Sequence, residues 1–175
     1  MTKSELLGVY RTADNHIQLA YASMVFWCYP DSPSIFKTLY EAMSTIPKPF
    51  PDLEKFLIDE TAMRIACEEI YDSAHRAAIK ELLPLTKAYC HETGQLGSLK
   101  AQPWFQFWRI LRNCFAHDMV FNFNEAEKAL LPVTWSGVTI DLSMNNKHLT
   151  HGKCSHEKLR ELLEAARTYI AKDVA

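Results

Sequence analysis

The spacing of apolar residues predicts that most of this chain is helical. Apolar side chains recur at helical intervals from Ser4 to about Tyr29, and again from about Pro33 to Thr45. Prolines between the two segments break the pattern at 30–33. The proline-rich stretch 46–51 cannot be helical and predicts a stiff connection.

A long helical pattern follows, from Asp52 to Thr93, with Asp52 as a candidate N-cap. This segment exceeds the length of a typical globular helix, so a break or kink is expected near Pro84. Gly94 and Gly97 are expected to end it.

In the last third of the chain, the predicted elements change from helix to β-hairpin and back to helix. An aromatic-rich helix is predicted from Gln102 to His117, and a small β-hairpin at about 132–143, turning at Ser136-Gly137. Ser155 is a candidate cap for a final amphipathic helix to about Ala171. The predicted fold is all-α: an antiparallel bundle of four to five long helices in one domain, 1–175, with a small β-hairpin insert before the last helix.

Composition and charge limit the classes of protein and the partners that fit this predicted fold. The chain has 175 residues, 48% of them hydrophobic and 23% charged, which is typical of a soluble domain with its own core. No signal-peptide pattern or membrane-length apolar segment occurs, so a cytoplasmic protein without membrane contact is expected. Five scattered cysteines argue against a disulfide framework. The net charge is −2, so any contact with RNA must be local.

Polar side chains gather on one side of the aromatic helix. At 100° per residue, Gln102, Gln106, Asn113 and His117 fall within roughly 80° of Arg109, whereas the aromatic and aliphatic residues take the opposite side. Arg112 lies about 140° from His117 on the same geometry. A two-fold pair of helices is therefore expected to bring Arg112 of one subunit near His117 of the other, which predicts a homodimer through this helix.

The pattern Arg112-Asn113-x3-His117, followed by Asp118, resembles the Arg-x4-6-His signature of the HEPN superfamily. Many members of that superfamily are metal-independent endoribonucleases that dimerise through the motif helices. The resemblance implies catalysis by Arg112, Asn113 and His117 without a cofactor, with RNA as the substrate. The chemistry agrees, because histidine can transfer protons near neutral pH, and a guanidinium can clamp phosphate oxygens. The 2′-OH of RNA is the nucleophile, and the implied products are a 2′,3′-cyclic phosphate and a 5′-hydroxyl.

A basic loop before the last helix offers further candidates. Lys153 is the best candidate there for binding phosphate, together with Arg109 on the aromatic helix. The same loop holds four metal-ligand types, His148, His151, Cys154 and His156, at a spacing that matches no common zinc pattern, so a metal site is only an alternative.

Three functions stay open on the sequence. The first is an endoribonuclease acting as a toxin or defence effector, with an antitoxin protein as a further partner. The second is a non-catalytic HEPN-like module for dimerisation or nucleotide binding. The third is a metal-binding regulatory protein built on the histidine-rich loop.

Overall fold

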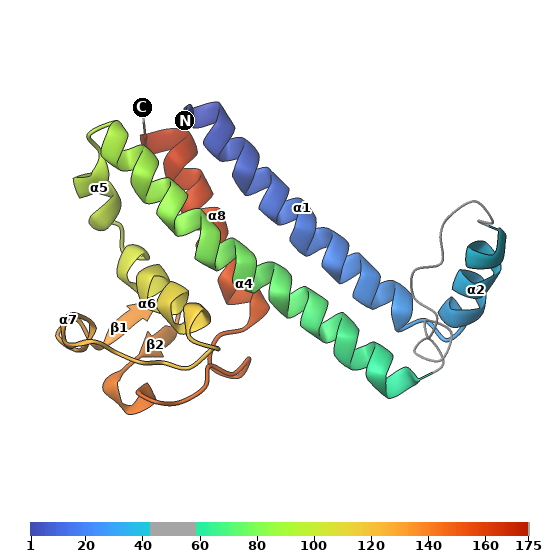
Figure 1. The fold of residues 1–175 in the computed structure, drawn as a ribbon. Helices are drawn as coiled ribbons and strands as arrows, with labels where there is room; N and C mark the ends of the chain where they lie inside the picture. The colour runs from blue at the N-terminus through green and yellow to red at the C-terminus, as the bar shows by residue number, and fades with distance from the viewer. Residues whose placement is uncertain (43–58, 175) are drawn as a thin grey trace. The chain divides into compact units, whose positions relative to one another are not determined.

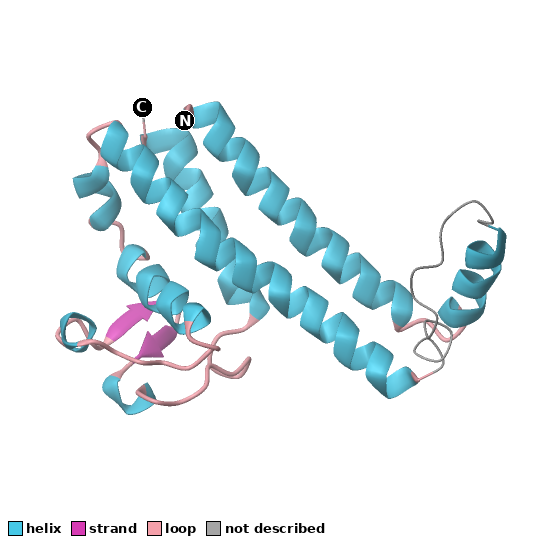
Figure 2. Cartoon of the chain, in the orientation of Figure 1, coloured by secondary structure: helices cyan, strands magenta, loops and turns pink. Residues whose placement is uncertain are grey.

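The computed structural model describes residues 1–42 and 59–174, and there the protein is all-α apart from one small antiparallel hairpin (Figures 1 and 2). The predicted fold class is confirmed. The chain divides into two compact units, one made of 1–14 and 75–175 and the other of 15–74. Helices α1 (Lys3–Trp27) and α4 (Glu60–Glu92) contribute to both units. That residues 1–175 form a single domain stays a prediction.

In the first unit, the start of α1 packs against the end of α4 in the antiparallel sense. Thr2 and Glu5 form reciprocal hydrogen bonds that cap α1, at 3.2 and 2.7 Å. The buried hydroxyl groups of Tyr10 and Thr86 are 2.7 Å apart, and they join the two helices inside an apolar core. The last helix, α8 (His156–Asp173), packs in the same core through residues such as Leu162.

Helix α4 runs without interruption through Pro84, so the predicted break there is wrong. Pro84 is exposed, whereas Leu82, Leu83 and Thr86 around it are buried. The proline ring therefore stands on the solvent side, where water can satisfy the carbonyl that loses its partner, and packing of the other side keeps the helix together.

The ends of α4 differ from the prediction for local reasons. A side-chain oxygen of Asp59 accepts a hydrogen bond from the Ala62 amide at 2.9 Å and caps the start, whereas the predicted cap Asp52 lies outside the described residues. Gly94 takes φ = 72° just after α4, as expected of a helix-ending glycine. Gly97 instead lies inside a short helix, α5 (Leu96–Lys100).

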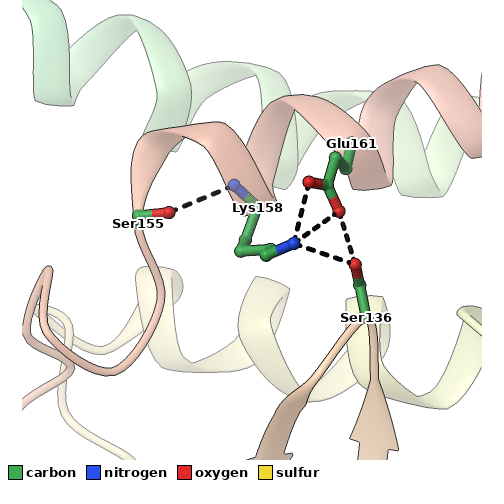
Figure 3. Close-up of polar contacts among 4 residues, drawn as sticks. All are labelled: Ser136, Ser155, Lys158 and Glu161. Atoms are coloured by element: carbon green, nitrogen blue, oxygen red, sulfur yellow. Dashed lines mark hydrogen bonds and ion pairs between the residues drawn. The ribbon is translucent and has the colours of Figure 1, made fainter.

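The rest of the first unit follows α5 along the chain. The aromatic helix is α6 (Phe105–Ala116), and a short helix α7 (Glu125–Lys128) comes next. The predicted hairpin is present as β1 (Val133–Trp135) and β2 (Val138–Ile140), with a 3-10 turn at Leu142–Met144. Helix α8 begins after Ser155, whose hydroxyl accepts from the Lys158 amide, as predicted (Figure 3).

The second unit contains the end of α1, helix α2 (Ser32–Ala42) and the start of α4. Met63 and Cys67 of α4 form its buried centre, and Met24, Trp27 and Phe36 pack against them. The predicted second helix is thus found, although the end of its predicted range, 43–45, lies outside the described residues. Within the described residues, no helix is both long and apolar enough to cross a bilayer.

Candidate functional site

Helix α6 is fixed by its apolar side. Phe107, Trp108 and Leu111 are fully buried, and the Trp108 indole N–H donates a 3.0 Å hydrogen bond to the backbone carbonyl of Ile79 in α4. The Phe107 ring packs on Trp135 of β1, with ring centroids 5.7 Å apart. Because one side is held by α4 and the hairpin, the motif residues on the other side have a defined orientation.

The chain leaves α6 through a tight turn that begins at His117. The His117 carbonyl accepts a hydrogen bond from the Val120 amide at 2.9 Å, and the two residues between them, Asp118 and Met119, have φ = 52° and 61°. Left-handed backbone costs a non-glycine residue about 1–3 kcal/mol, and such residues cluster at functional sites. The imidazole of His117, next to this turn, is exposed to solvent.

Asn113 is held by a carboxylate that the sequence analysis missed. Its amide nitrogen donates a 2.6 Å hydrogen bond to Oε1 of Glu127, a residue that is only 2% exposed. The other oxygen of Glu127 accepts from the Asn124 amide at 3.1 Å, and Asn124 caps α7 in return at 2.9 Å. The Asn124-x2-Glu127 pattern is a capping-box signature, so the sequence carried a signal for α7 but none for the contact with Asn113.

Arg112 is half-buried beside this pair. Its Nη1 donates to Oδ1 of Asn113 at 3.3 Å, and within the described residues it forms no ion pair. The chain Arg112–Asn113–Glu127 therefore links the motif to α7. Arg109, one turn earlier, is also half-buried, and its Nε atom has no hydrogen-bond partner among the described residues.

The basic loop before α8 lies against the chain that leaves α6 (Figure 1). The Leu149 amide donates to the carbonyl of Met119 at 2.7 Å, the Phe121 amide donates to the carbonyl of Lys147 at 3.0 Å, and Val120 and His148 form a bridge between them. These bonds place the loop next to the end of the motif helix. Lys153 on this loop is exposed.

The acidic and basic groups around the loop are partly paired. The Asp141 carboxylate accepts hydrogen bonds from Ser143, which lower its pKa, and Lys153 and Lys147 lower it further. Lys158 is committed to α8 and the hairpin turn, because its ammonium lies 2.8 Å from Glu161 and 3.1 Å from the Ser136 hydroxyl (Figure 3). Lys158 is therefore less available to a ligand than Lys153.

The four metal-ligand types of the loop do not come together as a set. Burial raises the pKa of the Cys154 thiol to about 11, and His148 is exposed in the bridge with Val120. The rings of His151 and His156 do meet, with centroids 4.5 Å apart, but neither His148 nor Cys154 joins them among the described residues.

Two residues of α4, missed from the sequence, lie at this end of the first unit. Nη1 of Arg76 is 3.7 Å from the sulfur of Met119, in the strained turn. The ring of His75 is 4.7 Å from that of His156, centroid to centroid. Nothing in the local pattern of α4 distinguishes these two residues, because their role depends on the loops that pack against them.

Comparison with known proteins adds no family assignment: no family model, curated protein or solved structure matches this chain at a significant level.

Proposed function

We propose that this protein is a metal-independent endoribonuclease of HEPN type, acting as a cytoplasmic homodimer. The observation that supports it best is the accessibility of the motif. Helix α6 buries its apolar side, while His117 is exposed and Arg112 is half-buried without an ion-pair partner among the described residues. An imidazole and a guanidinium that solvent can reach are the groups that cleavage through the 2′-OH requires.

The proposed reaction divides proton transfer and charge stabilisation between these groups. The imidazole of His117 accepts the proton of the 2′-OH, whose oxygen attacks the phosphorus. The bond to the 5′-oxygen breaks, and the protonated imidazole of His117 donates this proton to the leaving oxygen. Arg112 stabilises the negative charge on the non-bridging oxygens. The products are a 2′,3′-cyclic phosphate and a 5′-hydroxyl, so DNA, which lacks the attacking group, stays intact.

In this proposal Asn113 is a positioning residue. Its amide is engaged by the buried carboxylate of Glu127, and its carbonyl accepts from Arg112. Asn113 therefore orients the guanidinium instead of contacting the phosphate. The exposed Lys153 extends the basic surface along the substrate, because its loop is hydrogen-bonded to the chain that leaves α6.

A dimer supplies what one subunit lacks. Arg112 lies in α6 and His117 is its C-cap, and because positions five apart on a helix diverge by about 140°, we infer that the two side chains of one chain are directed to different points. A two-fold axis at this end of α6 brings Arg112 of one subunit to His117 of the other. A neutralising protein partner of antitoxin type belongs to the same proposal, because a free nuclease of this kind harms its own cell.

The first experiment measures cleavage of a labelled single-stranded RNA by the purified protein in excess EDTA. We expect cleavage with cyclic-phosphate ends, and a loss of at least about a hundredfold in both His117→Ala and Arg112→Ala. His16→Ala and Arg11→Ala are matched controls, because both side chains are exposed on α1, far along the chain from the motif. Intact RNA with the wild-type protein, or cleavage that survives either motif substitution, contradicts the proposal.

The second experiment tests whether the site is shared between subunits. In a mixed dimer of the Arg112→Ala and His117→Ala chains, one composite site carries both substitutions and the other carries neither. Random exchange at equal amounts makes half of the dimers mixed, so about a quarter of the wild-type activity should return. No recovery after demonstrated subunit exchange means that each site lies within one chain.

One observation favours the alternative of a non-catalytic module for dimerisation or nucleotide binding. The bonds from Arg112 to Asn113 and from Asn113 to Glu127 give the motif a structural use without any substrate. If this alternative holds, the protein forms dimers and RNA stays intact at every protein concentration. Arg112→Ala then lowers the free energy of unfolding.

A further inference from the structure

The second unit exposes most of the large apolar side chains that solvent can reach. Nine of the thirteen exposed ones in the described ranges lie within 15–74, the smaller of the two units. Several of them are in the second half of α1. Leu19, Val25 and Phe26 are 67%, 51% and 38% exposed, Ala22 is exposed between them, and Tyr29, just beyond the helix, is 55% exposed. Together these five residues are the α1 face.

The α1 face lies opposite the side of the helix that is already packed. At 100° per residue, its four positions within the helix fall within about 120° of one another. The packed side of this stretch lies roughly 140–160° from the middle of the face on the same geometry, and it consists of Ile17, Ala20, Met24 and Trp27. This part of α1 is therefore apolar on two opposite sides, and its own unit covers only one of them.

Local contacts hold the end of the α1 face in place. The Phe26 ring packs edge-on against Trp27, with centroids 5.0 Å apart, and Trp27 packs in turn against Phe36 of α2. Ser32, which is fully buried, donates a hydrogen bond from its hydroxyl to the carbonyl of Phe26, which joins the end of α1 to the start of α2. A face that is ordered before binding loses little conformational entropy when a partner covers it.

The charge of this segment narrows the choice of partner. From Asn15 to Pro30 the sequence contains no lysine, arginine, aspartate or glutamate. A nucleic acid or an anionic lipid surface is recognised by cationic side chains, which this segment lacks. A neutral apolar face fits another neutral apolar face, and a second copy of the chain supplies one that can pair without like-charge repulsion across the contact.

The area of the face is sufficient for a pair of copies. Its four large side chains are roughly half exposed, so each buries on the order of 100 Å² when it is covered. With the exposed neighbours Asn15, Gln18 and Ala22, two copies bury roughly 1,000–1,200 Å² in total, which is the lower end of the range for specific interfaces. The expected association is therefore reversible and depends on protein concentration.

We propose that the α1 face pairs with the α1 face of a second copy around a two-fold axis. Leu19 and Phe26 are seven residues apart, which is the repeat of apolar positions along paired helices, and the small Ala22 between them allows close approach. This contact belongs to the second unit and is separate from the pairing of α6 proposed above, so it does not depend on the nuclease proposal.

Charges outside the face set the salt dependence of this association. Among its described residues the second unit has seven acidic and two basic side chains, a net charge of −5, and none of them lies in 15–30. Two such units repel each other, and salt screens that repulsion. Pairing through the α1 face should therefore strengthen as salt is added, whereas binding of RNA weakens. Association that weakens with salt contradicts the proposal.

The experiment measures the assembly mass of the full chain by light scattering and sedimentation equilibrium over a range of concentrations. We expect the double variant Leu19→Lys/Phe26→Lys to have half the wild-type mass at the same concentration, with a dissociation constant raised at least about a hundredfold. The matched control is Ile65→Lys/Leu142→Lys, which changes two residues of 51% and 57% exposure outside the face and should keep the wild-type mass. Circular dichroism establishes that each variant is folded. Equal masses for the wild type and Leu19→Lys/Phe26→Lys at every concentration overturn the proposal.

A mixture tests whether the face meets itself. Chains with Leu19→Glu/Phe26→Glu repel one another as the lysine variants do, but an equimolar mixture of the two variants brings opposite charges together and should recover the wild-type mass. No recovery means that the face contacts a different part of the second copy, which contradicts two-fold pairing of the α1 face.

RNA cleavage is measured on the same variants, because the two proposals fail in different ways. If α6 pairs as proposed, loss of the α1 contact leaves a dimer that still cleaves RNA, and if α6 does not pair, it leaves a monomer. In both cases the halved mass supports pairing through the α1 face, and the cleavage assay reports on the nuclease alone.

Discussion

Removing the Asn113 amide should destabilise the protein through Glu127. The Nδ2 atom of Asn113 is 2.6 Å from Oε1 of a carboxylate that is 2% exposed, so this carboxylate relies on protein donors in the folded state. Hydrogen bonds to charged groups contribute about 1.5–3 kcal/mol, and a buried acceptor left unpaired costs a similar amount. We therefore expect Asn113→Ala to lower the free energy of unfolding by about 2–3 kcal/mol.

A second substitution, Asn113→Asp, should destabilise the protein more than Asn113→Ala does. Asn113→Asp keeps the shape of the side chain but places a second carboxylate within hydrogen-bond distance of Glu127. Repulsion is added to the loss of the donor, so at pH 7 the variant should be less stable than Asn113→Ala. For a chain of this length, 2–3 kcal/mol corresponds to a fall in Tm of about 5–10 °C.

Urea unfolding at pH 7, followed by tryptophan fluorescence and circular dichroism, measures both variants. The matched control is Asn122→Ala, because Asn122 is an exposed asparagine in the same region and should change stability by less than about 0.5 kcal/mol. If Asn113→Ala loses no more stability than that control, the amide is not the partner on which the buried carboxylate depends.

Four further predictions concern buried or strained groups elsewhere in the protein. Trp108→Phe removes the indole donor to α4 and should cost about 1–2 kcal/mol in urea unfolding. Asp118→Gly relieves the left-handed backbone and should stabilise by about 1 kcal/mol in the same assay. Burial raises the pKa of Tyr10, so above about pH 10 the unfolded chain loses this proton before the folded one does. Stability should therefore fall as pH rises there, with a smaller slope in Tyr10→Phe. Burial raises the pKa of the Cys114 thiol to about 12, and only Cys28 is exposed, so a disulfide reagent at pH 8 should modify one thiol quickly and the other four after unfolding.

The local elements of this protein follow from short-range sequence patterns. Helical periodicity, the capping residue Ser155 and the Ser136-Gly137 turn were enough to predict the long helices and the hairpin, because each signal acts over a few neighbouring residues. The break predicted at Pro84 is wrong for a reason that is not local. Whether a proline interrupts a helix depends on which side faces solvent, and that side is set by packing.

The candidate site was predicted only in part. The polar side of α6 and the exposure of His117 follow from helix geometry, so both could be predicted from the sequence. The contact of Asn113 with Glu127 was not, because α7 must first fold back onto α6.

Tertiary structure alone decided which distant side chains share a space. His75 and His156 are about eighty residues apart in the chain and carry no common local signal, yet their rings are 4.7 Å apart. Arg76 reaches the turn after α6 in the same way. Local patterns report how a segment buries its own apolar side, whereas contacts between segments depend on how the whole core packs, and that depends on all of the buried surfaces together.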